Sequence, residues 1–427
     1  MRQSTHVVVL GGGYAGLMAA MRLAKKTRPE VAITLVNAGV WFYERVRNHQ
    51  VAAGQPVGRY PLASLLRGTR IGFVQGAVTD LDPAARRVTL RGAGDAGENV
   101  EGQTIGYDWL VYALGSTSQT GGIPGAREHA YTLDHPSVTA LAACLPEIER
   151  SHGRVLVIGG GPTGVELATE MAESHPDAQV TLVTRREVVP RFSRGARAHV
   201  RRSLAQLGIA LAEQAAIAEV RPDAARASDG RRFPFDAAVL TGGFGVSDLA
   251  RRSGLRVNAL GQILTDRTLR SLSHGEIYAV GDAAMPAEEP GAPVRMSVIT
   301  SLFMGAHGAD SLAARLRGRR PAAFGISYIA AGISLGRHNG VVQFLDWNRD
   351  TPLRTILTGR LAVRFREFFV GFALWAIKAQ RVAPWVFDWP GRRKMRRLPV
   401  VVPAGAPAPR IAARTAVPAD TAAGGER

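Results

Sequence analysis

Residues 7–23 read VVVLGGGYAGLMAAMRL, and residues 155–171 repeat the same pattern as VLVIGGGPTGVELATEM. In each stretch a continuous apolar run, typical of a buried parallel strand, leads through a glycine-rich turn into a helical pattern. The first glycine of such a turn permits a tight bend, the second lets a phosphate approach the backbone, and the third lets the helix pack on the strand. The glycines that fit the spacing G-x-G-x-x-G are Gly11, Gly13 and Gly16 in the first copy and Gly159, Gly161 and Gly164 in the second.

The repeat predicts an α/β fold with two Rossmann-like dinucleotide-binding domains. The helix after each turn presents free backbone N–H groups and a positive dipole to a pyrophosphate. The residues that open these helices are therefore expected to line the nucleotide sites. They are Tyr14 and Ala15 in the first copy and Pro162 and Thr163 in the second.

The residue at the end of the next strand bears on which nucleotide each site takes. A site for an adenine dinucleotide usually has an acidic residue there, to bind the ribose, whereas this chain has Asn37 and Thr184. We expect Asn37 to hydrogen-bond a ribose hydroxyl. Arg185 and Arg191 follow Thr184, and arginines attract the 2′-phosphate of NADPH. The second site is predicted to favour NADPH over NADH, although such arginines also occur as ordinary solvated residues in an Arg-rich protein.

Composition excludes several classes of function. The 427 residues include one cysteine, which excludes an intrachain disulfide, and ten scattered histidines that show no metal-ligand spacing. No metal is therefore predicted. The net charge of +18 is not accompanied by any nucleic-acid-binding motif, and no nucleic-acid partner is predicted.

Three further segments give the chain a family resemblance. GEIYAVGDAA at 275–284, YDWLVYALGS at 107–116 and FDAAVLTGGF at 235–244 occur in order around the two glycine turns. Together they resemble the two-dinucleotide-binding-domain flavoproteins, the superfamily of pyridine nucleotide-disulfide oxidoreductases. The resemblance implies FAD in the first site, NADPH or NADH in the second, and Asp282 on the ribityl chain of FAD. The other residues of these segments that it places at the cofactors are Ala113, Gly115, Gly243 and Gly281.

The same resemblance predicts the domain organisation. Residues 1–118 and 245–320 form the FAD-binding domain, and residues 119–244 form the NAD(P)-binding domain inserted in it. Residues 321–397 form a small C-terminal α/β region with a basic aromatic helix. The Pro- and Ala-rich residues 398–427 are expected to be a disordered tail.

The electron acceptor is less clearly indicated. Residues 40–55 lack the cysteine pair of the disulfide reductases, which excludes disulfide reduction. GISLGRHNGVV at 332–342 resembles the type II NADH dehydrogenases, which reduce quinones. In their quinone-site helix those enzymes carry two glutamines, whereas this chain has Val298, Ile299 and Phe303 at the matching positions. The resemblance also places the start of this helix, at Val298, beside the flavin.

The leading hypothesis is an FAD-dependent NAD(P)H dehydrogenase that passes electrons to a quinone or quinone-like acceptor. One alternative is a soluble flavin oxidoreductase acting on a specific small molecule; another is a sensor that binds flavin and NAD(P)H. Glu166 matches a family glutamate near the nicotinamide, with a supporting or capping role equally open. His49, in FYERVRNHQ at 42–50, is the second catalytic candidate.

The C-terminal segment is basic and aromatic. Residues 354–397 contain eleven Arg or Lys against Glu367 and Asp388, interleaved with Phe and Trp. This pattern favours a helix in an anionic membrane interface; packing on the protein's own core or on a second subunit of a homodimer is the alternative. Without a signal peptide or a spanning apolar run, the protein is predicted to be cytoplasmic and peripheral on the cytoplasmic face of the cell membrane.

Overall fold

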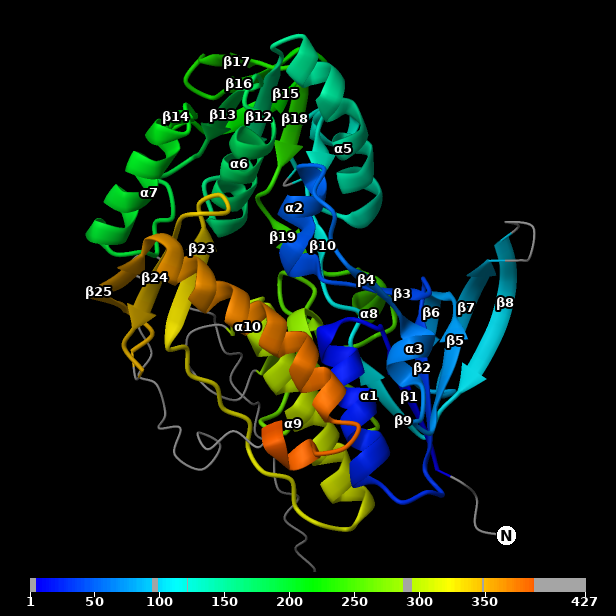
Figure 1. Ribbon diagram of the computed structural model, residues 1–427. Coiled ribbons are helices and arrows are strands. Elements are labelled where there is room, and N and C mark those ends of the chain that lie inside the picture. Colours follow the sequence, from blue (N-terminus) through cyan, green and yellow to red (C-terminus); the bar gives the residue numbers. More distant parts are fainter. Residues whose placement is uncertain (1–4, 94–98, 121, 287–293, 348, 388–427) are drawn as a thin grey trace, which may run out of the picture.

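The computed structural model describes residues 5–93, 99–120, 122–286, 294–347 and 349–387. The tail predicted to be disordered, 398–427, lies outside the described residues. The chain forms two nucleotide-binding halves, one above the other in Figure 1, and a C-terminal region that runs along both. The α/β class predicted from the sequence is confirmed.

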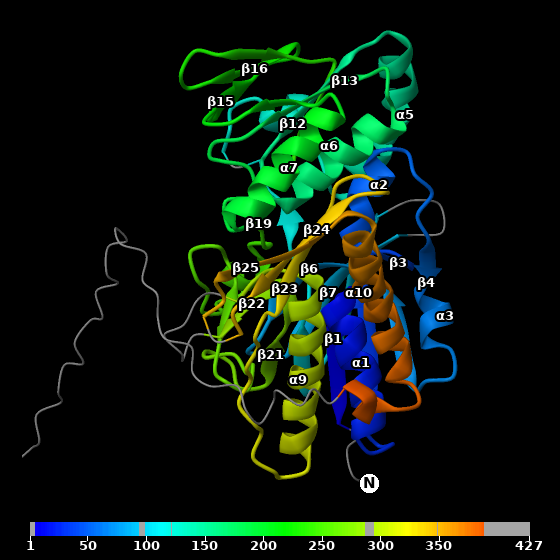
Figure 2. The same cartoon turned by 60° about the vertical axis from the view of Figure 1, so that its left-hand side comes forward.

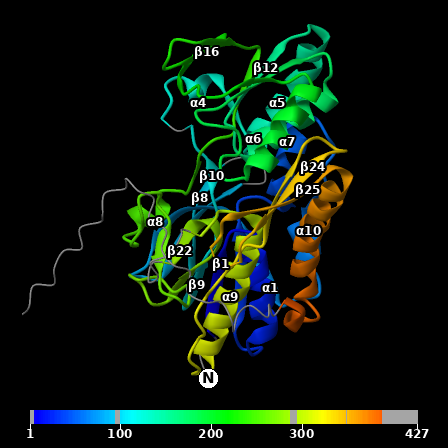
Figure 3. The same ribbon diagram turned by 90° about the vertical axis from the view of Figure 1, so that its left-hand side faces the viewer.

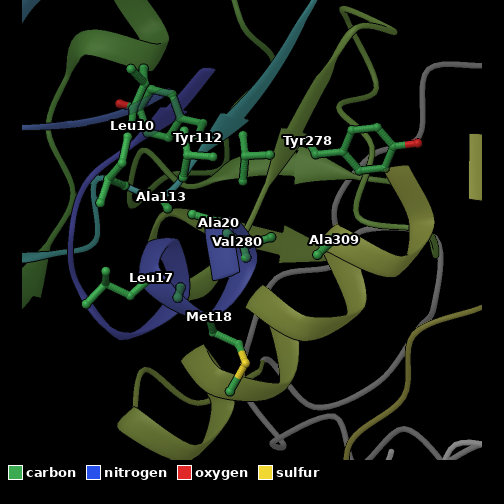
Figure 4. Packing of buried hydrophobic residues seen from close by; sticks show 14 of the residues in the cluster. Leu10, Leu17, Met18, Ala20, Tyr112, Ala113, Tyr278, Val280 and Ala309 are labelled. Atoms are coloured by element: carbon green, nitrogen blue, oxygen red, sulfur yellow. The ribbon is translucent and has the colours of Figure 1, made fainter. Parts of the chain in front are cut away.

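The first half is built on a parallel sheet in the order β21-β9-β1-β2-β5. Strand β1 lies in its middle, and its residues Val7 to Leu10 are fully buried, which explains the continuous apolar run. Helices α1 and α9 pack on the sheet, and Figure 4 shows Leu17 and Met18 of α1 within this core. The elements are β1 (His6–Leu10), α1 (Tyr14–Lys26), β2 (Ala32–Asn37), β5 (Ile71–Gln75), β9 (Trp109–Tyr112), β21 (Ile277–Ala279) and α9 (Val298–Leu316).

Smaller elements complete this half. An antiparallel sheet in the order β6-β7-β8 adds Leu81, Val88 and Leu90 to the same core. Its strands are β6 (Ala77–Asp82), β7 (Arg87–Ala93) and β8 (Asn99–Gly106). The remaining elements are β3 (Trp41–Tyr43), η1 (Arg45–Arg47), α2 (Asn48–Ala52), β4 (Arg59–Pro61), α3 (Leu62–Leu66), α8 (Leu249–Arg252), β20 (Ile263–Thr265), η2 (Gly281–Ala283) and β22 (Ala284–Pro286).

The second half repeats the plan with a parallel sheet in the order β11-β18-β12-β13-β14. Its elements are α4 (Ala126–His129), β11 (Tyr131–Thr132), α5 (His135–Arg150), β12 (Arg154–Ile158), α6 (Pro162–Ser174), β13 (Gln179–Val183), α7 (Arg194–Gln206), β14 (Ala210–Ala212), β15 (Ile217–Val220), β16 (Ala224–Ala227), β17 (Arg232–Pro234) and β18 (Ala237–Leu240).

Two short antiparallel strands join the halves. β10 (Thr117–Ser118) pairs with β19 (Phe244–Gly245), so the chain enters and leaves the second half side by side. These strands lie where the sequence analysis places the ends of the inserted domain. The domain boundaries themselves stay a prediction.

The C-terminal region contacts both halves. Its antiparallel sheet packs near α6 and α7, where the Ser193 N–H donates to Gln343 Oε1 at 2.9 Å. Helix α10 then runs down to α1, as Figures 1 and 2 show. The elements are β23 (Ala330–Ser334), β24 (Gly340–Leu345), β25 (Pro352–Thr358), α10 (Gly359–Ala379) and η3 (Pro384–Phe387). This arrangement places residues of the C-terminal region beside the second glycine turn.

Candidate functional site

The first glycine turn is as tight as the spacing predicts. Gly11 has a φ of +99°, and a Cβ on Gly11 would collide with the carbonyl oxygen of Ala113. A Cβ on Gly16 would collide with the carbonyl oxygen of Gly11. Larger residues therefore cannot replace either glycine without moving the backbone. Ala113, which lies directly behind the turn, is buried.

The N-terminus of α1 is free to receive a phosphate. Gly13 is its N-cap, no side chain caps the helix, and its first turn has no acidic residue. Backbone N–H groups at such an end need an acceptor, and an anion supplies one. Tyr14 and Ala15 are the first residues of the helix and both are buried. Behind them, a Cβ on Gly305 of α9 would collide with the carbonyl oxygen of Ala15, so α1 and α9 pack backbone to backbone.

The side chain of Asn37, the last residue of β2, is hydrogen-bonded to the first glycine turn. Its Oδ1 accepts a hydrogen bond from the Gly12 N–H at 2.8 Å, and its Nδ2 donates to the Gly39 carbonyl at 2.8 Å. The side chain therefore joins the glycine turn to the segment that follows β2. The ribose contact expected for Asn37 stays a prediction.

Asp282 carries an unused acceptor at the same site. Its Oδ2 accepts a hydrogen bond from the Ser116 hydroxyl at 2.7 Å, whereas its Oδ1 is buried and has no hydrogen-bond partner among the described residues. Burial raises the pKa of Asp282, whereas the Ser116 hydrogen bond, the charge of Arg45 and the nearby Ser301 and Ser297 oppose that rise. A buried, unpaired carboxylate oxygen is costly unless a ligand donates to it. A polyol such as the ribityl chain of FAD fits this requirement.

The residues around Asp282 shape this cradle. Gly281 has a φ of +71°, and a Cβ on it would lie 2.8 Å from Ala15 Cβ and 3.4 Å from Ser301 Oγ. The first turn of α9 is therefore beside Gly281, and its first residue, Val298, is partly exposed. Gly115, with a φ of +69°, precedes Ser116. These residues gather where the resemblance places FAD.

The second glycine turn has the same geometry. Gly159 has a φ of +128°, and a Cβ on it would lie 2.7 Å from Thr241 Oγ1. A Cβ on Gly164 would collide with the Gly159 carbonyl oxygen. Gly161 is the N-cap of α6, which begins at Pro162 and Thr163 and has no capping side chain and no acidic residue in its first turn. Like the N-terminus of α1, this helix end offers free backbone N–H groups to an anion.

The far end of this site is basic and exposed. Thr184 is buried against the turn, since a Cβ on Gly160 would lie 2.5 Å from Thr184 Oγ1. Arg185 and Arg191 are exposed, and neither forms an ion pair within the described part of the chain. Gly243, with a φ of +82°, lies beyond the end of β18. The selectivity for NADPH stays a prediction.

Glu166 lies in the first turns of α6 and is held by the C-terminal region. Its Oε1 accepts hydrogen bonds from the Ser334 N–H at 3.1 Å and from Arg366 Nε at 2.9 Å. Burial by itself raises the pKa of a carboxyl group, yet the pKa of Glu166 is lowered, because Arg366 and the Ser334 N–H stabilise its charge. The structure thus provides a buried ion pair where the sequence analysis left a catalytic or a supporting role open.

His49 is brought to the same place by α2. It is 2% exposed, its Nε2 has no hydrogen-bond partner among the described residues, and burial lowers its pKa to about 4. Its electrostatic neighbours are Glu166 and Arg366, from α6 and α10. The two catalytic candidates therefore share one buried environment, and His49 is neutral at pH 7.

Sequence reasoning missed the partners of these groups. Ser116, Ser334 and Arg366 contact Asp282 or Glu166 across 166 to 200 residues of chain. Arg366 gave no signal of its own, because it lies among many similar arginines of the basic segment.

The C-terminal helix divides its apolar residues between two faces. Leu374 and Ile377 pack into the core of the first half, whereas Phe368 is 66% and Trp375 is 50% exposed. The exposed apolar surface of α10 is therefore smaller than the number of apolar residues in the helix suggests. Across the ranges that the structure describes, no helix is both long and apolar enough to cross a membrane.

Known proteins resemble this chain over most of its length. The type II NADH:quinone oxidoreductase of Staphylococcus aureus (strain MSSA476) is 29% identical over 383 residues, covering 80% of this chain and 90% of the relative. Two solved structures share the fold. NDH2 from Plasmodium falciparum in complex with NADH has a TM-score of 0.73 at 14% identity and covers 91% of this chain and 99% of its own. Sulfide:quinone oxidoreductase from Aquifex aeolicus has a TM-score of 0.71 at 20% identity and covers 90% and 95%.

The model of one protein family matches residues 5–308, which include both glycine turns and Asp282. The predicted oxidoreductase class and the pairing of FAD with a nicotinamide nucleotide are confirmed with the family. The chain belongs to the pyridine nucleotide-disulphide oxidoreductase family.

Proposed function

We propose that this protein is an FAD-dependent NAD(P)H dehydrogenase that passes electrons to a quinone or quinone-like acceptor. The observation that carries the proposal is the pair of glycine turns, each of which leads into a helix without a capping side chain. The unpaired Oδ1 of Asp282 lies beside the first turn. Such a pair suits one resident and one exchanging dinucleotide. The curated relative named above as a quinone oxidoreductase supports the choice of acceptor.

Each of these groups has a task in the proposed reaction. When bound, FAD supplies a carrier that takes two electrons as a hydride and releases them singly or in pairs. The N-terminus of α1 would hold the pyrophosphate of FAD, Asp282 would accept a hydrogen bond from a ribityl hydroxyl, and the N-terminus of α6 would hold the nicotinamide dinucleotide. Glu166 would orient the nicotinamide end, and His49, neutral beside it, would act as a proton acceptor during turnover.

The acceptor site differs from the quinone-site pattern of type II NADH dehydrogenases. Ile299 and Phe303 stand in place of glutamines, and Phe303 packs on Phe387 with ring centroids 5.2 Å apart. An apolar wall of this kind suits a lipophilic ring but offers it no amide hydrogen bonds. The same departure favours the second candidate, a soluble flavin oxidoreductase acting on a specific small molecule.

The exposed face of α10 supports peripheral attachment to an anionic membrane at its cytoplasmic face. Leu361, Phe368 and Trp375 are exposed on α10, and Trp385 follows it at 67% exposure. Arg360 and Lys378 are exposed on the same helix. Aromatic side chains flanked by basic ones bind the interface of anionic bilayers. Figure 3 shows α10 on the outside of the first half, where a bilayer or the second subunit of a homodimer could meet it.

Anaerobic mixing of the purified protein with NADH or NADPH tests the proposal. Bleaching of a bound flavin, followed by its reoxidation with ubiquinone or menaquinone analogues, is the expected result. Absence of flavin, or flavin that stays oxidised with both nucleotides, contradicts it. Reoxidation by ferricyanide or oxygen but by none of the quinones would favour the second candidate.

A further inference from the structure

Five charged side chains of alternating sign connect the two halves of the molecule. Arg366 of α10 donates from Nη1 to Oε1 of its neighbour Glu367 at 2.9 Å, and Arg47 donates from Nη2 to Glu367 Oε2 at 2.6 Å. The ends of the series are Glu166, bonded to Arg366, and Glu44, whose Oε2 lies 3.6 Å from Arg47 Nε. The series thus begins on the helix of the second glycine turn and ends in the segment after β3.

The two carboxylate oxygens of Glu166 differ in the hydrogen bonds that they accept. Oε1 accepts from Arg366 Nε and from both the N–H and the hydroxyl of Ser334, at 2.9 to 3.3 Å. No hydrogen bond from a described residue reaches Oε2. One oxygen is therefore fixed by the C-terminal region, while the other stays available to a ligand.

Burial strengthens the attraction between Glu166 and Arg366. Glu166 is 9% and Arg366 is 8% exposed, so their attraction is poorly screened by water. The other titratable group that faces Glu166 is His49 of α2. Arg366 also faces Glu367 of α10 and Glu170 of α6, and Arg47 of η1 binds Glu367. Removing one member of a buried pair leaves the other as an uncompensated charge.

We propose that Arg366 is a positioning residue, which holds Glu166 ionised and turned so that Oε2 faces the nicotinamide end of the bound nucleotide. Glu367 and Arg47 orient Arg366 from the other side. The C-terminal region therefore completes a site whose other parts belong to the two nucleotide-binding halves. This inference rests on the proposed role of Glu166 in the reaction.

The test compares five variants of the full chain, one of which is the single variant Glu166→Gln. Arg366→Gln removes the charge, and Arg366→Lys keeps it. Arg364→Gln changes an exposed arginine two residues away on the same helix, as the matched control. The double variant Glu166→Gln with Arg366→Gln shows whether the effects act through Glu166. The rate of flavin reduction at saturating NADH or NADPH and the calorimetric Kd for the oxidised nucleotide are both measured from pH 5 to 9.

In Arg366→Gln we expect a new ionisation in both pH profiles, because an unpaired buried glutamate titrates at higher pH. Each pH unit by which the pKa of Glu166 rises changes the rate about tenfold at pH values below the new pKa. Arg366→Lys and Arg364→Gln should keep the profile of the unaltered protein, and the new ionisation should be absent from the double variant.

Three results overturn the inference: an unaltered pH profile in Arg366→Gln, the same new ionisation in Arg366→Lys, or its persistence in the double variant. Should Arg366→Gln fail to fold, Arg366→Lys decides: the inference expects it to keep both the rate and the pH profile of Arg364→Gln, whereas a purely structural role of the guanidinium lowers its rate. If Glu166→Gln alone leaves reduction and binding unchanged, the proposed role of Glu166 fails instead.

Discussion

Arg22 of α1 and Asp310 of α9 form a partly buried ion pair, with Arg22 Nε 2.7 Å from Asp310 Oδ1 and Nη2 3.0 Å from Oδ2. The side chain of Arg22 is fully buried. Its Nη1 also donates to Gln380 Oε1 at 2.9 Å and to the Pro384 carbonyl at 2.5 Å, both beyond the end of α10. One guanidinium therefore joins three segments that are far apart in the sequence.

Replacing Arg22 should destabilise the protein strongly. In Arg22→Met, the partly buried Asp310 and the Gln380 amide oxygen lose the hydrogen bonds from Arg22, and losing one partner of a buried pair costs about 3–5 kcal/mol. Lys26, 2.9 Å from Asp310, compensates in part and sets the expectation at the lower end of that range. Urea unfolding measures the change. Lys25→Gln, at an exposed position of the same helix, is the control and should change the free energy of unfolding by less than about 0.5 kcal/mol.

Asp282→Ala should weaken FAD binding. The variant loses the acceptor that is otherwise unpaired, and a hydrogen bond to a charged group contributes about 1.5–3 kcal/mol, or roughly ten- to 150-fold in Kd. Flavin content after purification and fluorescence titration of the flavin-free protein measure it. Asp177→Ala, an exposed aspartate of the second half, should bind FAD normally. Equal affinity in the two variants would contradict the role given to Asp282.

Arg185→Glu should reverse the selectivity between nicotinamide nucleotides. A glutamate repels the 2′-phosphate and accepts from a free ribose hydroxyl, so the ratio of kcat/KM for NADPH to that for NADH should fall at least about tenfold. Steady-state kinetics with both nucleotides measure the ratio. Arg226→Glu, on β16, introduces the same charge change at an exposed site of the same half. An unchanged ratio in Arg185→Glu would mean that this arginine is an ordinary surface residue.

Stability should depend on pH through His49. Because burial lowers its pKa to about 4, against 6.5 for an exposed histidine, the unfolded chain binds the proton first as the pH falls. The contribution is fully present above about pH 6.5 and is lost towards pH 4, by about 3 kcal/mol in all. Glu166, whose pKa is lowered, affects the pH dependence of stability only at pH values more acidic than those at which His49 does. Urea unfolding between pH 4.5 and 7.5 should show a smaller slope for His49→Gln than for His129→Gln, an exposed control. Equal slopes would exclude His49 as the source.

Membrane attachment should depend on the exposed rings of α10. The double variant Phe368→Ser, Trp375→Ser removes two partly exposed aromatic groups, and burying even one such side chain contributes about 1.5–3 kcal/mol. We expect binding to phosphatidylglycerol vesicles to weaken at least about tenfold in a flotation assay. Leu260→Ser, at an exposed position of the first half, is the control. Undiminished vesicle binding by the double variant would contradict membrane attachment through these rings. A dimer that dissociates in the double variant would instead indicate that the rings form a subunit interface.

The parts of the fold that follow local rules were predictable. Each glycine turn is specified by about ten consecutive residues, and the collisions found for Gly11, Gly16 and Gly164 are those that the spacing implies. Asp282 was reached through a family resemblance, and its unpaired Oδ1 gives that assignment a physical reason.

The surroundings of Glu166 were not predictable in the same way. The contact with Arg366 spans 200 residues, and sequence patterns do not show which arginine of a basic segment turns inward. The inward turn results from the packing of α10, whose Ala373 and Ile377 contact the first half while Arg366 reaches the second. Only the three-dimensional arrangement distinguishes Arg366 from the exposed Arg364.

The path of α10 also has a consequence for biosynthesis. Both nucleotide-binding halves are complete in the chain by the end of α9 at Leu316, whereas Arg366 and the residues that contact Arg22 follow 50 to 70 residues later. On the ribosome, the two halves therefore emerge before the segment that fastens them to each other. A nascent chain arrested ahead of α10 should already retain FAD, yet it should acquire fast hydride transfer only after α10 has left the exit tunnel.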